Sequence, residues 1–294
     1  MLIGLVGKPS SGKSTFFKAA TLAEVEIASY PFTTIKPNHG VGYVKVDCIE
    51  REFSVKCQPA HGFCIEGKRF VPVELMDVAG LVPGASEGKG LGNQFLDDLR
   101  QADVFIHVVD ASGTTDEEGK PVEKHDPSRD ILFLENELNK WFYNLMVKAW
   151  KGFVKKIAQE EGGNFSEAVA KQFSGLKVNE EHVKKVLARL RLPEKPLNWN
   201  EEQLFWFASE LRTESKPTII AANKVDLEKA HANYQFLKMR FPGLIIIPCS
   251  ADSELALREA AKTGLIDYIP GERDFEIKGE LNEEQSEALS DIKE

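Results

Sequence analysis

The chain alternates short apolar runs with amphipathic segments. The runs are nearly continuous in Val, Ile and Leu, as is typical of strands buried on both faces of a parallel sheet. Strands are predicted at Leu2–Val6, Val41–Val46, Val71–Val78, Val104–Asp110, Thr218–Ala222 and Leu244–Cys249. Apolar positions at helical spacing predict helices at Ser14–Ala23, Asn93–Gln101, Asp226–Arg240 and Ser253–Thr263. This alternation indicates an α/β fold with a doubly wound, mainly parallel sheet, whose ligand-binding loops lie at the carboxyl ends of its strands.

The segment between Asp110 and Thr218 carries no convincing strand pattern. Apolar residues recur at helical spacing from Ile131 to Ile157 and from Val183 to Leu190, with a shorter stripe at Leu204–Leu211. We expect two long amphipathic helices in an antiparallel hairpin or short coiled coil. The two helices are expected to join around Glu161–Asn164 or a little later, and Pro193–Trp199 is the expected linker back to the sheet. Trp141, Trp150 and Trp206 are expected to pack in the core of this segment. The predicted parts are therefore 1–112, an inserted helical domain at 113–214, and 215–294 as the second part with a C-terminal extension.

Residues 7–14 follow the first predicted strand and fit the phosphate-loop spacing G-x-x-x-x-G-K-[ST]. Glycines at these positions let backbone N–H groups converge on an anion, next to the start of a helix. Lys13 is expected to reach the β- and γ-phosphates, and the Ser14 hydroxyl to bind Mg²⁺. The predicted nucleotide-binding residues of this loop are Gly7, Lys8, Pro9, Ser10, Ser11, Gly12, Lys13, Ser14 and Thr15.

Further short motifs follow other predicted strands or the first predicted helix. Asp77 and Gly80 form a D-x-x-G pattern, in which the carboxylate is expected to hold Mg²⁺ through a water and the glycine N–H to meet the γ-phosphate. Thr34, in the loop after the first predicted helix, is a third Mg²⁺ ligand candidate, besides Ser14 and Asp77. Lys13, Thr34 and Gly80 are therefore the catalytic candidates.

The base-reading candidates lie after two later strands. In Asn223-Lys224-Val225-Asp226, the Asp226 carboxylate is placed to accept both N–H donors of a guanine edge, with Asn223 at the opposite edge. Ser250–Ala251 is placed to supply a backbone N–H to guanine O6. Adenine offers no matching donor pair, so this set favours GTP and GDP.

The strings YPFTTIKPNHGVG, DVAGLVPGASEGKGLGNQFLDDLRQAD, HVVDASG and AANKVD resemble those of the Obg/YchF group of GTPases, particularly archaeal members of the YchF branch. The resemblance implies a P-loop NTPase with a Ras-like G domain, an inserted helical domain and a ribosome-linked role. The branch normally continues into a TGS domain, so we expect either truncation at Leu289–Glu294 or a member that lacks it. Intact Lys224 and Asp226 predict GTP preference where some relatives favour ATP. Ser10 replaces the Asn of potassium-dependent relatives, which argues against potassium activation.

Hydrolysis is expected to be slow. Leu81 follows Gly80 where Ras-like enzymes place the Gln that orients the attacking water, and leucine cannot position water. Gly84, Gly88, Gly90 and Gly92 favour a switch segment over an ordinary loop. The alternatives left open are a nucleotide-loaded scaffold with negligible turnover and an ATP-preferring member of the family.

The composition is that of a globular protein of 294 residues, with 42% hydrophobic residues and a net charge of −9. The charge argues against DNA binding, and the chain lacks a predicted membrane span or signal peptide, so a cytoplasmic location is expected. Cys48, Cys57, His61 and Cys64 leave zinc binding open, although their spacing is not that of paired C-x-x-C motifs. A candidate basic face for ribosomal RNA comprises Lys148, Lys151, Lys155, Lys156, Lys184, Lys185 and Arg189.

Overall fold

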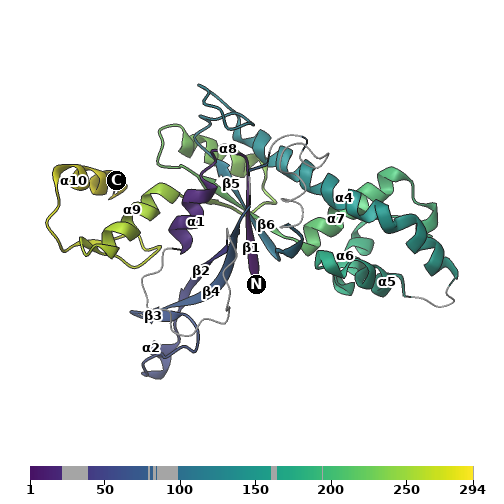
Figure 1. The fold of residues 1–294 in the computed structure, drawn as a ribbon, viewed down its shortest axis with the longest axis horizontal. Helices are drawn as coiled ribbons and strands as arrows, with labels where there is room; N and C mark the ends of the chain where they lie inside the picture. The colour runs from purple at the N-terminus through teal and green to yellow at the C-terminus, as the bar shows by residue number, and fades with distance from the viewer. Residues whose placement is uncertain are drawn as a thin grey trace.

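The computed structural model describes residues 1–21, 39–78, 80–81, 84, 99–159, 164–193 and 195–293. Its centre is a sheet ordered β2-β4-β1-β5-β6-β7, with β3 also paired to β4 (Figure 1). The strands are β1 (Leu2–Val6), β2 (His39–Asp47), β3 (Phe63–Ile65), β4 (Lys68–Asp77), β5 (Val104–Asp110), β6 (Thr218–Asn223) and β7 (Ile246–Pro248). Strands β4, β1, β5, β6 and β7 run parallel, whereas β2 and β3 pair antiparallel with β4. The predicted mainly parallel α/β sheet is confirmed.

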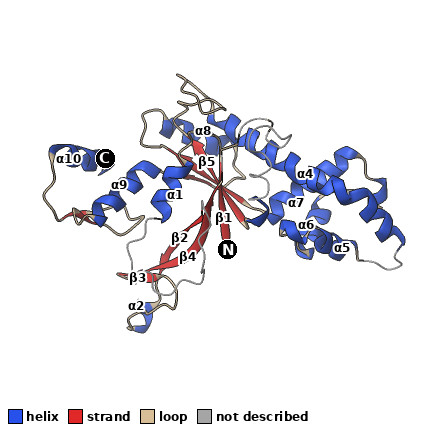
Figure 2. Ribbon diagram, viewed as in Figure 1, coloured by secondary structure: helices blue, strands red, loops and turns tan. Residues whose placement is uncertain are grey.

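Two groups of helices pack near the sheet (Figures 1 and 2). Helix α1 (Lys13–Thr21) packs against α9 (Ala251–Lys262) and also touches β2 and β4. Helix α8 (Ala230–Arg240) contacts β7 and α4 (Pro127–Gln159). The predicted helix at Asp226–Arg240 thus begins later than expected, and most of the one predicted at Asn93–Gln101 lies outside the described residues.

Helix α4 is the longest helix described and carries the predicted apolar stripe. It begins at Pro127, which needs no partner for a backbone N–H, and the Asp126 carboxylate accepts the Ser128 N–H at 2.9 Å. Its buried face joins β1, β4 and β5 in one continuous apolar core. Arg212, buried in α7 (Glu201–Ser215), pairs with Glu135 of α4, so α7 returns to the sheet against α4.

The prediction of a second long helix is wrong. The chain returns through α5 (Phe165–Gln172), the 3-10 turns η2 (Ser174–Leu176) and η3 (Pro196–Asn198), α6 (Glu180–Arg189) and α7. Asn164, Asn179 and Asn200 each cap a new helix N-terminus. Each cap satisfies backbone donors that a continuous helix would bond internally, so the return divides into short helices.

Two of the three tryptophans assigned to the insertion core are buried there. Trp141 and Trp150 are 2% and 5% exposed, and Trp150 stacks on Trp199 with ring centroids 5.5 Å apart. Trp206 is 50% exposed, so its assignment to the core is wrong. It lies on the opposite side of α7 from its buried neighbours Leu204, Phe207 and Leu211. The boundaries at 112 and 214 stay predictions.

The last described segment comprises β8 (Ile266–Asp267), β9 (Glu276–Ile277) and α10 (Glu283–Lys293). It packs on α9 through a separate apolar cluster of Leu257, Ile266, Tyr268, Phe275 and Leu289. Figure 1 shows this segment beside α9, on the far side of the molecule from α5 and α6. No helix among the described residues has the length and apolar character needed to span a bilayer.

Candidate functional site

The phosphate loop connects β1 to α1 in a conformation that depends on its glycines. Gly7 and Gly12 have φ angles of +151° and +93°, which side chains disfavour. A Cβ on Gly7 would lie 2.5 Å from the Val108 carbonyl oxygen, and one on Gly12 would lie 2.2 Å from Asn223 Nδ2. The loop therefore packs against β5 and β6 through bare backbone, as a cradle for an anion requires.

Lys13 is the first residue of α1 and is almost fully buried. Its Nζ donates to the carbonyl oxygen of Lys8 at 2.7 Å, which folds the side chain back over the loop. Burial lowers the pKa of Lys13 to about 8, and the nearby Asp77 carboxylate partly opposes that shift. A buried ammonium on a phosphate loop is poised to gain an anionic partner.

The two described Mg²⁺ candidates lie together. The Ser14 hydroxyl donates to Asp77 Oδ2 at 2.9 Å, because α1 starts beside the carboxyl end of β4. A hydroxyl and a carboxylate oxygen are ligands that suit a hard divalent cation, so this pair fits Mg²⁺. Thr34, the third candidate, lies outside the described residues.

Asn223 connects three loops at the end of β6 and is 2% exposed. Its Nδ2 donates to the Ser11 carbonyl oxygen at 3.0 Å, and its Oδ1 accepts the Ala251 N–H at 2.9 Å. The Asn223 amide and the Ala251 N–H were both predicted to contact guanine. In this structure they bond to each other and to the phosphate loop, so their direct contact with the base stays a prediction.

Lys224 and Asp226 lie beside that junction. Lys224 has a φ of 64°, and its Nζ donates to the Ser10 carbonyl oxygen at 3.0 Å and to Asp110 Oδ2 at 2.9 Å. Its aliphatic stem therefore runs between the phosphate loop and β5. Asp226 is exposed, as a group that accepts hydrogen bonds from a ligand should be. Ser250 caps α9 by accepting the Ser253 N–H.

Gly80 and Leu81 lie against the phosphate loop. A Cβ on Gly80 would come within 3.0 Å of the Pro9 nitrogen, and the Leu81 N–H donates to the Gly7 carbonyl oxygen at 3.0 Å. The Leu81 side chain is 2% exposed and belongs to the core shared with α4. Gly84 N–H donates to Glu137 of α4 at 3.3 Å, whereas Gly88, Gly90 and Gly92 lie outside the described residues.

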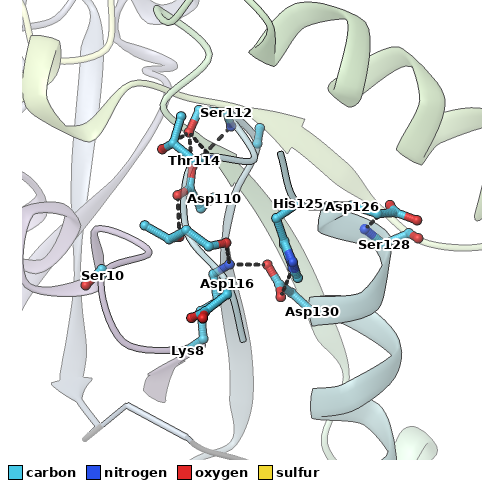
Figure 3. Close-up of polar contacts among 12 residues, drawn as sticks. Lys8, Ser10, Asp110, Ser112, Thr114, Asp116, His125, Asp126, Ser128 and Asp130 are labelled. Atoms are coloured by element: carbon cyan, nitrogen blue, oxygen red, sulfur yellow. Dashed lines mark hydrogen bonds and ion pairs between the residues drawn. The ribbon is translucent and has the colours of Figure 1, made fainter. Parts of the chain in front are cut away.

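Lys8, one of the loop residues predicted to bind the nucleotide, directs its side chain towards α4. Its Nζ points away from the cradle, donating to the Thr115 carbonyl oxygen at 2.6 Å and pairing with Asp130 Oδ2 at 2.9 Å (Figure 3). His125 Nε2 lies 2.7 Å from the other Asp130 oxygen. Lys8 therefore leaves only its backbone for a ligand.

Asp110, the last residue of β5, is the centre of a second group of buried hydrogen bonds near the phosphate loop. It accepts a hydrogen bond from the Ser112 hydroxyl (Figure 3). It also accepts hydrogen bonds from the Thr115 hydroxyl and from Lys224 Nζ. Burial alone would raise the pKa of Asp110, but these hydrogen bonds bring it below its ordinary value. Sequence reasoning missed Asp110, although its place at a strand end was a usable signal. Asp130 gave none, because it lies within an ordinary helical pattern.

Two sequence models match the chain: an "Obg-like GTPase YGR210-like, G4 motif-containing domain" over residues 221–294, and a "50S ribosome-binding GTPase" over residues 2–140. An uncharacterized GTP-binding protein of Methanocaldococcus jannaschii is 49% identical over 99% of this chain and 73% of its own length. The chain belongs to the Obg/YchF group of GTP-binding proteins. The similarity supports the archaeal YchF-like branch in particular.

Other relatives of this Obg/YchF protein agree. An uncharacterized GTP-binding protein of Schizosaccharomyces pombe is 41% identical over 92% of the chain, which spans 66% of that protein. The crystal structure of a GTP-binding protein from Pyrococcus horikoshii superposes with a TM-score of 0.75, at 42% identity, covering 92% of this chain and 70% of the other. The P-loop GTPase fold with a G domain is therefore confirmed.

Proposed function

We propose that this Obg/YchF protein is a Mg²⁺-dependent switch that binds GTP, hydrolyses it slowly and acts with the ribosome. One observation carries the proposal. The Asn223 amide joins the phosphate loop at Ser11 to the loop after β7 at Ala251, so elements for phosphate and base lie at one sheet edge. Ligands of open α/β sheets bind at this carboxyl edge.

The geometry supports distinct roles for the residues around the phosphates. The N-terminus of α1 and the loop N–H groups face a bound anion, and Lys13 supplies positive charge. Mg²⁺, held by Ser14 and Asp77, would neutralise charge on the phosphate oxygens when bound. Gly80 lies beside the loop at Pro9, and we expect its N–H to meet the γ-phosphate.

Slow hydrolysis is supported by the position of Leu81. Its side chain is buried in the core and its N–H is bonded to Gly7, so it does not reach an attacking water. Positioning and electrostatic stabilisation supply most of the catalysis in phosphoryl transfer, and a missing water-positioning group can come from a partner. We expect turnover well below one per second without a partner.

Ribosome association is supported by the similarity of residues 2–140 to a family described as 50S ribosome-binding GTPases. The predicted basic face divides in two. Lys184, Lys185 and Arg189 of α6 pair with acidic neighbours, which offsets their charge. Lys148, Lys151, Lys155 and Lys156 are exposed along α4 and form the remaining candidate contact for RNA phosphates.

Base selection can be tested by titrating fluorescent GDP, GTP and ATP analogues with Mg²⁺ into wild-type protein and Asp226→Asn. The variant should lose at least tenfold in GTP affinity. It should gain affinity for xanthosine triphosphate, whose C2 oxygen accepts the hydrogen bond that an Asn amide donates. Glu228→Gln, an exposed neighbour, is the matched control and should leave all affinities unchanged. Equal wild-type affinity for ATP and GTP would contradict the assignment.

Switch function can be tested separately by measuring turnover and co-sedimentation with ribosomes. GTP-dependent co-sedimentation that stimulates hydrolysis supports the proposal. Charge reversal at Lys151 and Lys155 should weaken co-sedimentation, while reversal at Lys184 should have less effect because its charge is already paired. If tightly bound nucleotide never turns over, even on ribosomes, the protein is the nucleotide-loaded scaffold instead.

A further inference from the structure

Three cysteines and a glutamate converge at the edge of the sheet far from the nucleotide loops. Cys48 follows β2, Glu50 opens α2 (Glu50–Phe53), Cys57 lies in the next loop and Cys64 lies in β3. One ligand atom from each residue lies within 4.8 Å of all the others. We call residues 48–69 the cysteine tip; in Figure 1 it comprises the segment around α2 and β3.

The spacing of these atoms is close to that of a tetrahedral zinc site. Zn–S bonds of about 2.3 Å place the sulfur atoms about 3.8 Å apart, so a contraction of about 1 Å suffices. The cysteines come from separate segments of the tip, and no two belong to one helical turn. His61, the fourth residue proposed from the sequence, is exposed and does not belong to this group.

Although Phe63 of β3 stacks on Phe70 with ring centroids 4.6 Å apart, hydrophobic burial does little to hold the part of the cysteine tip before β3 in place. Its large apolar residues Ile49, Phe53 and Val55 are 63%, 66% and 61% exposed. Cys48, by contrast, is 8% exposed, so the thiol group lies inside while the apolar side chains lie outside. Small units without a sufficient apolar core are commonly stabilised by disulfides or metals. All four cysteines of the chain are free thiols here.

We propose that Cys48, Cys57 and Cys64 bind one structural Zn²⁺, with a carboxylate oxygen of Glu50 as the fourth ligand. Binding releases the three thiol protons to solvent, and the thiolates then bond to the ion. The completed site is net negative. Arg69 partly offsets this charge, because its Nη1 lies 3.5 Å from Cys57 Sγ. Glu50 is also oriented for this role. Its Oε2 accepts the Cys57 N–H at 2.9 Å, which holds the carboxylate beside the cysteines.

The first test measures zinc in full-length protein produced in zinc-supplemented medium and desalted. We expect one zinc per chain in the wild type, and Co²⁺ added after chelation should give the visible absorption of tetrahedral thiolate coordination. Cys57→Ser and Cys64→Ser should weaken metal affinity by more than the about 10–100-fold that losing an outer hydrogen-bond partner costs. Cys249→Ser, outside the tip, is the matched control and should retain full zinc content.

Folding of each variant is checked by nucleotide binding. The tip and the nucleotide loops lie at opposite ends of β4, about 26 Å apart over the eight-residue step from Arg69 to Asp77. Folded variants should therefore bind GDP normally while lacking zinc. Absence of zinc in wild-type protein, octahedral Co²⁺ spectra, or equal zinc content in Cys57→Ser and Cys249→Ser would overturn the proposal. A spectrum that changes with His61→Asn but not with Glu50→Gln would overturn the assignment of Glu50.

Discussion

The ammonium of Lys8 lies 2.9 Å from Oδ2 of Asp130, and both side chains are only 1% exposed. Lys8 belongs to the phosphate loop and Asp130 to the first turns of α4, so one buried ion pair joins the nucleotide cradle to the helical region. Burial raises the pKa of Asp130, while Lys8 and His125 oppose that shift. The pair gives the two parts of the molecule a direct connection that does not pass through the sheet.

Removing one partner of this pair should be strongly destabilising. Lys8→Met leaves the Asp130 carboxylate buried without its main counter-charge, at a cost of about 3–5 kcal/mol in the free energy of unfolding. Lys8→Met with Asp130→Leu removes both charges and should recover much of that loss. Urea unfolding followed by tryptophan fluorescence measures both, because Trp141 and Trp150 report on α4.

An exposed pair provides the control for this comparison. Lys120 and Glu118 are 70% and 59% exposed, so water screens their attraction and Lys120→Met should cost far less than Lys8→Met. If Lys8→Met lowered the free energy of unfolding no more than Lys120→Met, the ion pair between Lys8 and Asp130 would not contribute to stability.

His107 makes stability depend on pH. It lies in β5 behind the phosphate loop, where burial, with Lys13 and Lys8 nearby, lowers its pKa to about 3. In the unfolded chain His107 takes up a proton near pH 6.5, whereas in the folded chain it stays neutral down to about pH 3. The free energy of unfolding therefore falls as pH drops from 6.5 towards 3. The expected loss from this group is about 2 kcal/mol at pH 5.

His107→Gln should flatten that dependence in acid denaturation curves. His231→Gln, at an exposed position on α8, should leave it unchanged. Identical slopes for wild type and His107→Gln would show that the histidine is not held neutral in the folded protein.

The sequence predicted the elements that have strong local signals. Val104–Asp110 forms β5 with the predicted bounds, and the glycines of the phosphate loop occupy the conformations that their spacing required. Buried strands and phosphate loops can be predicted because hydrophobic continuity and glycine spacing are local properties. The helical return could not be predicted in the same way, because the spacing of apolar residues does not show where Asn164, Asn179 and Asn200 cap new helices.

The directions of individual side chains in the site could not be predicted from the sequence either. Lys8 lies inside the motif, yet its Nζ turns to Asp130, a residue with no motif of its own. Asn223 was expected at the base, but its amide is bonded to Ser11 and Ala251. Such pairings depend on contacts between residues far apart in the chain, and a single sequence does not encode them at any fixed spacing.

Nucleotide affinity should fall above pH 8. With a pKa of about 8, half of the Lys13 ammonium is already neutral at that pH, whereas a bound triphosphate favours the charged form. Binding at pH 8 should therefore take up a fraction of a proton, and affinity should fall by up to about tenfold for the next pH unit. Calorimetry in buffers of different ionisation enthalpy measures this uptake.

Lys13→Met is the control, because it has no ammonium to titrate and should show weak binding without proton uptake. In the free protein the sign is opposite: the unfolded Lys13 binds more protons than the folded one between pH 8 and 10.5, so stability rises with pH in that window. Proton release on nucleotide binding at pH 8 would contradict this account of Lys13.

Gly12→Ala should separate the phosphate loop from β6. The added Cβ would lie 2.2 Å from Asn223 Nδ2, at a φ of +93°, so the amide must leave its hydrogen bond to Ser11. We expect at least a hundredfold loss of GDP affinity and a loss of about 1–3 kcal/mol in stability. Gly152→Ala is the matched control, because no atom lies within 4 Å of the new methyl in α4, and it should stabilise by about 0.5–1 kcal/mol.

A double-mutant cycle identifies the cause. If the methyl group acts through Asn223, then Gly12→Ala and Asn223→Ala damage the same contact, and their combined loss should be smaller than the sum of the single losses. Fully additive losses in GDP affinity would mean that Gly12 matters for its backbone conformation alone. The Asn223 connection would then not be what aligns the base-reading loops with the phosphate loop.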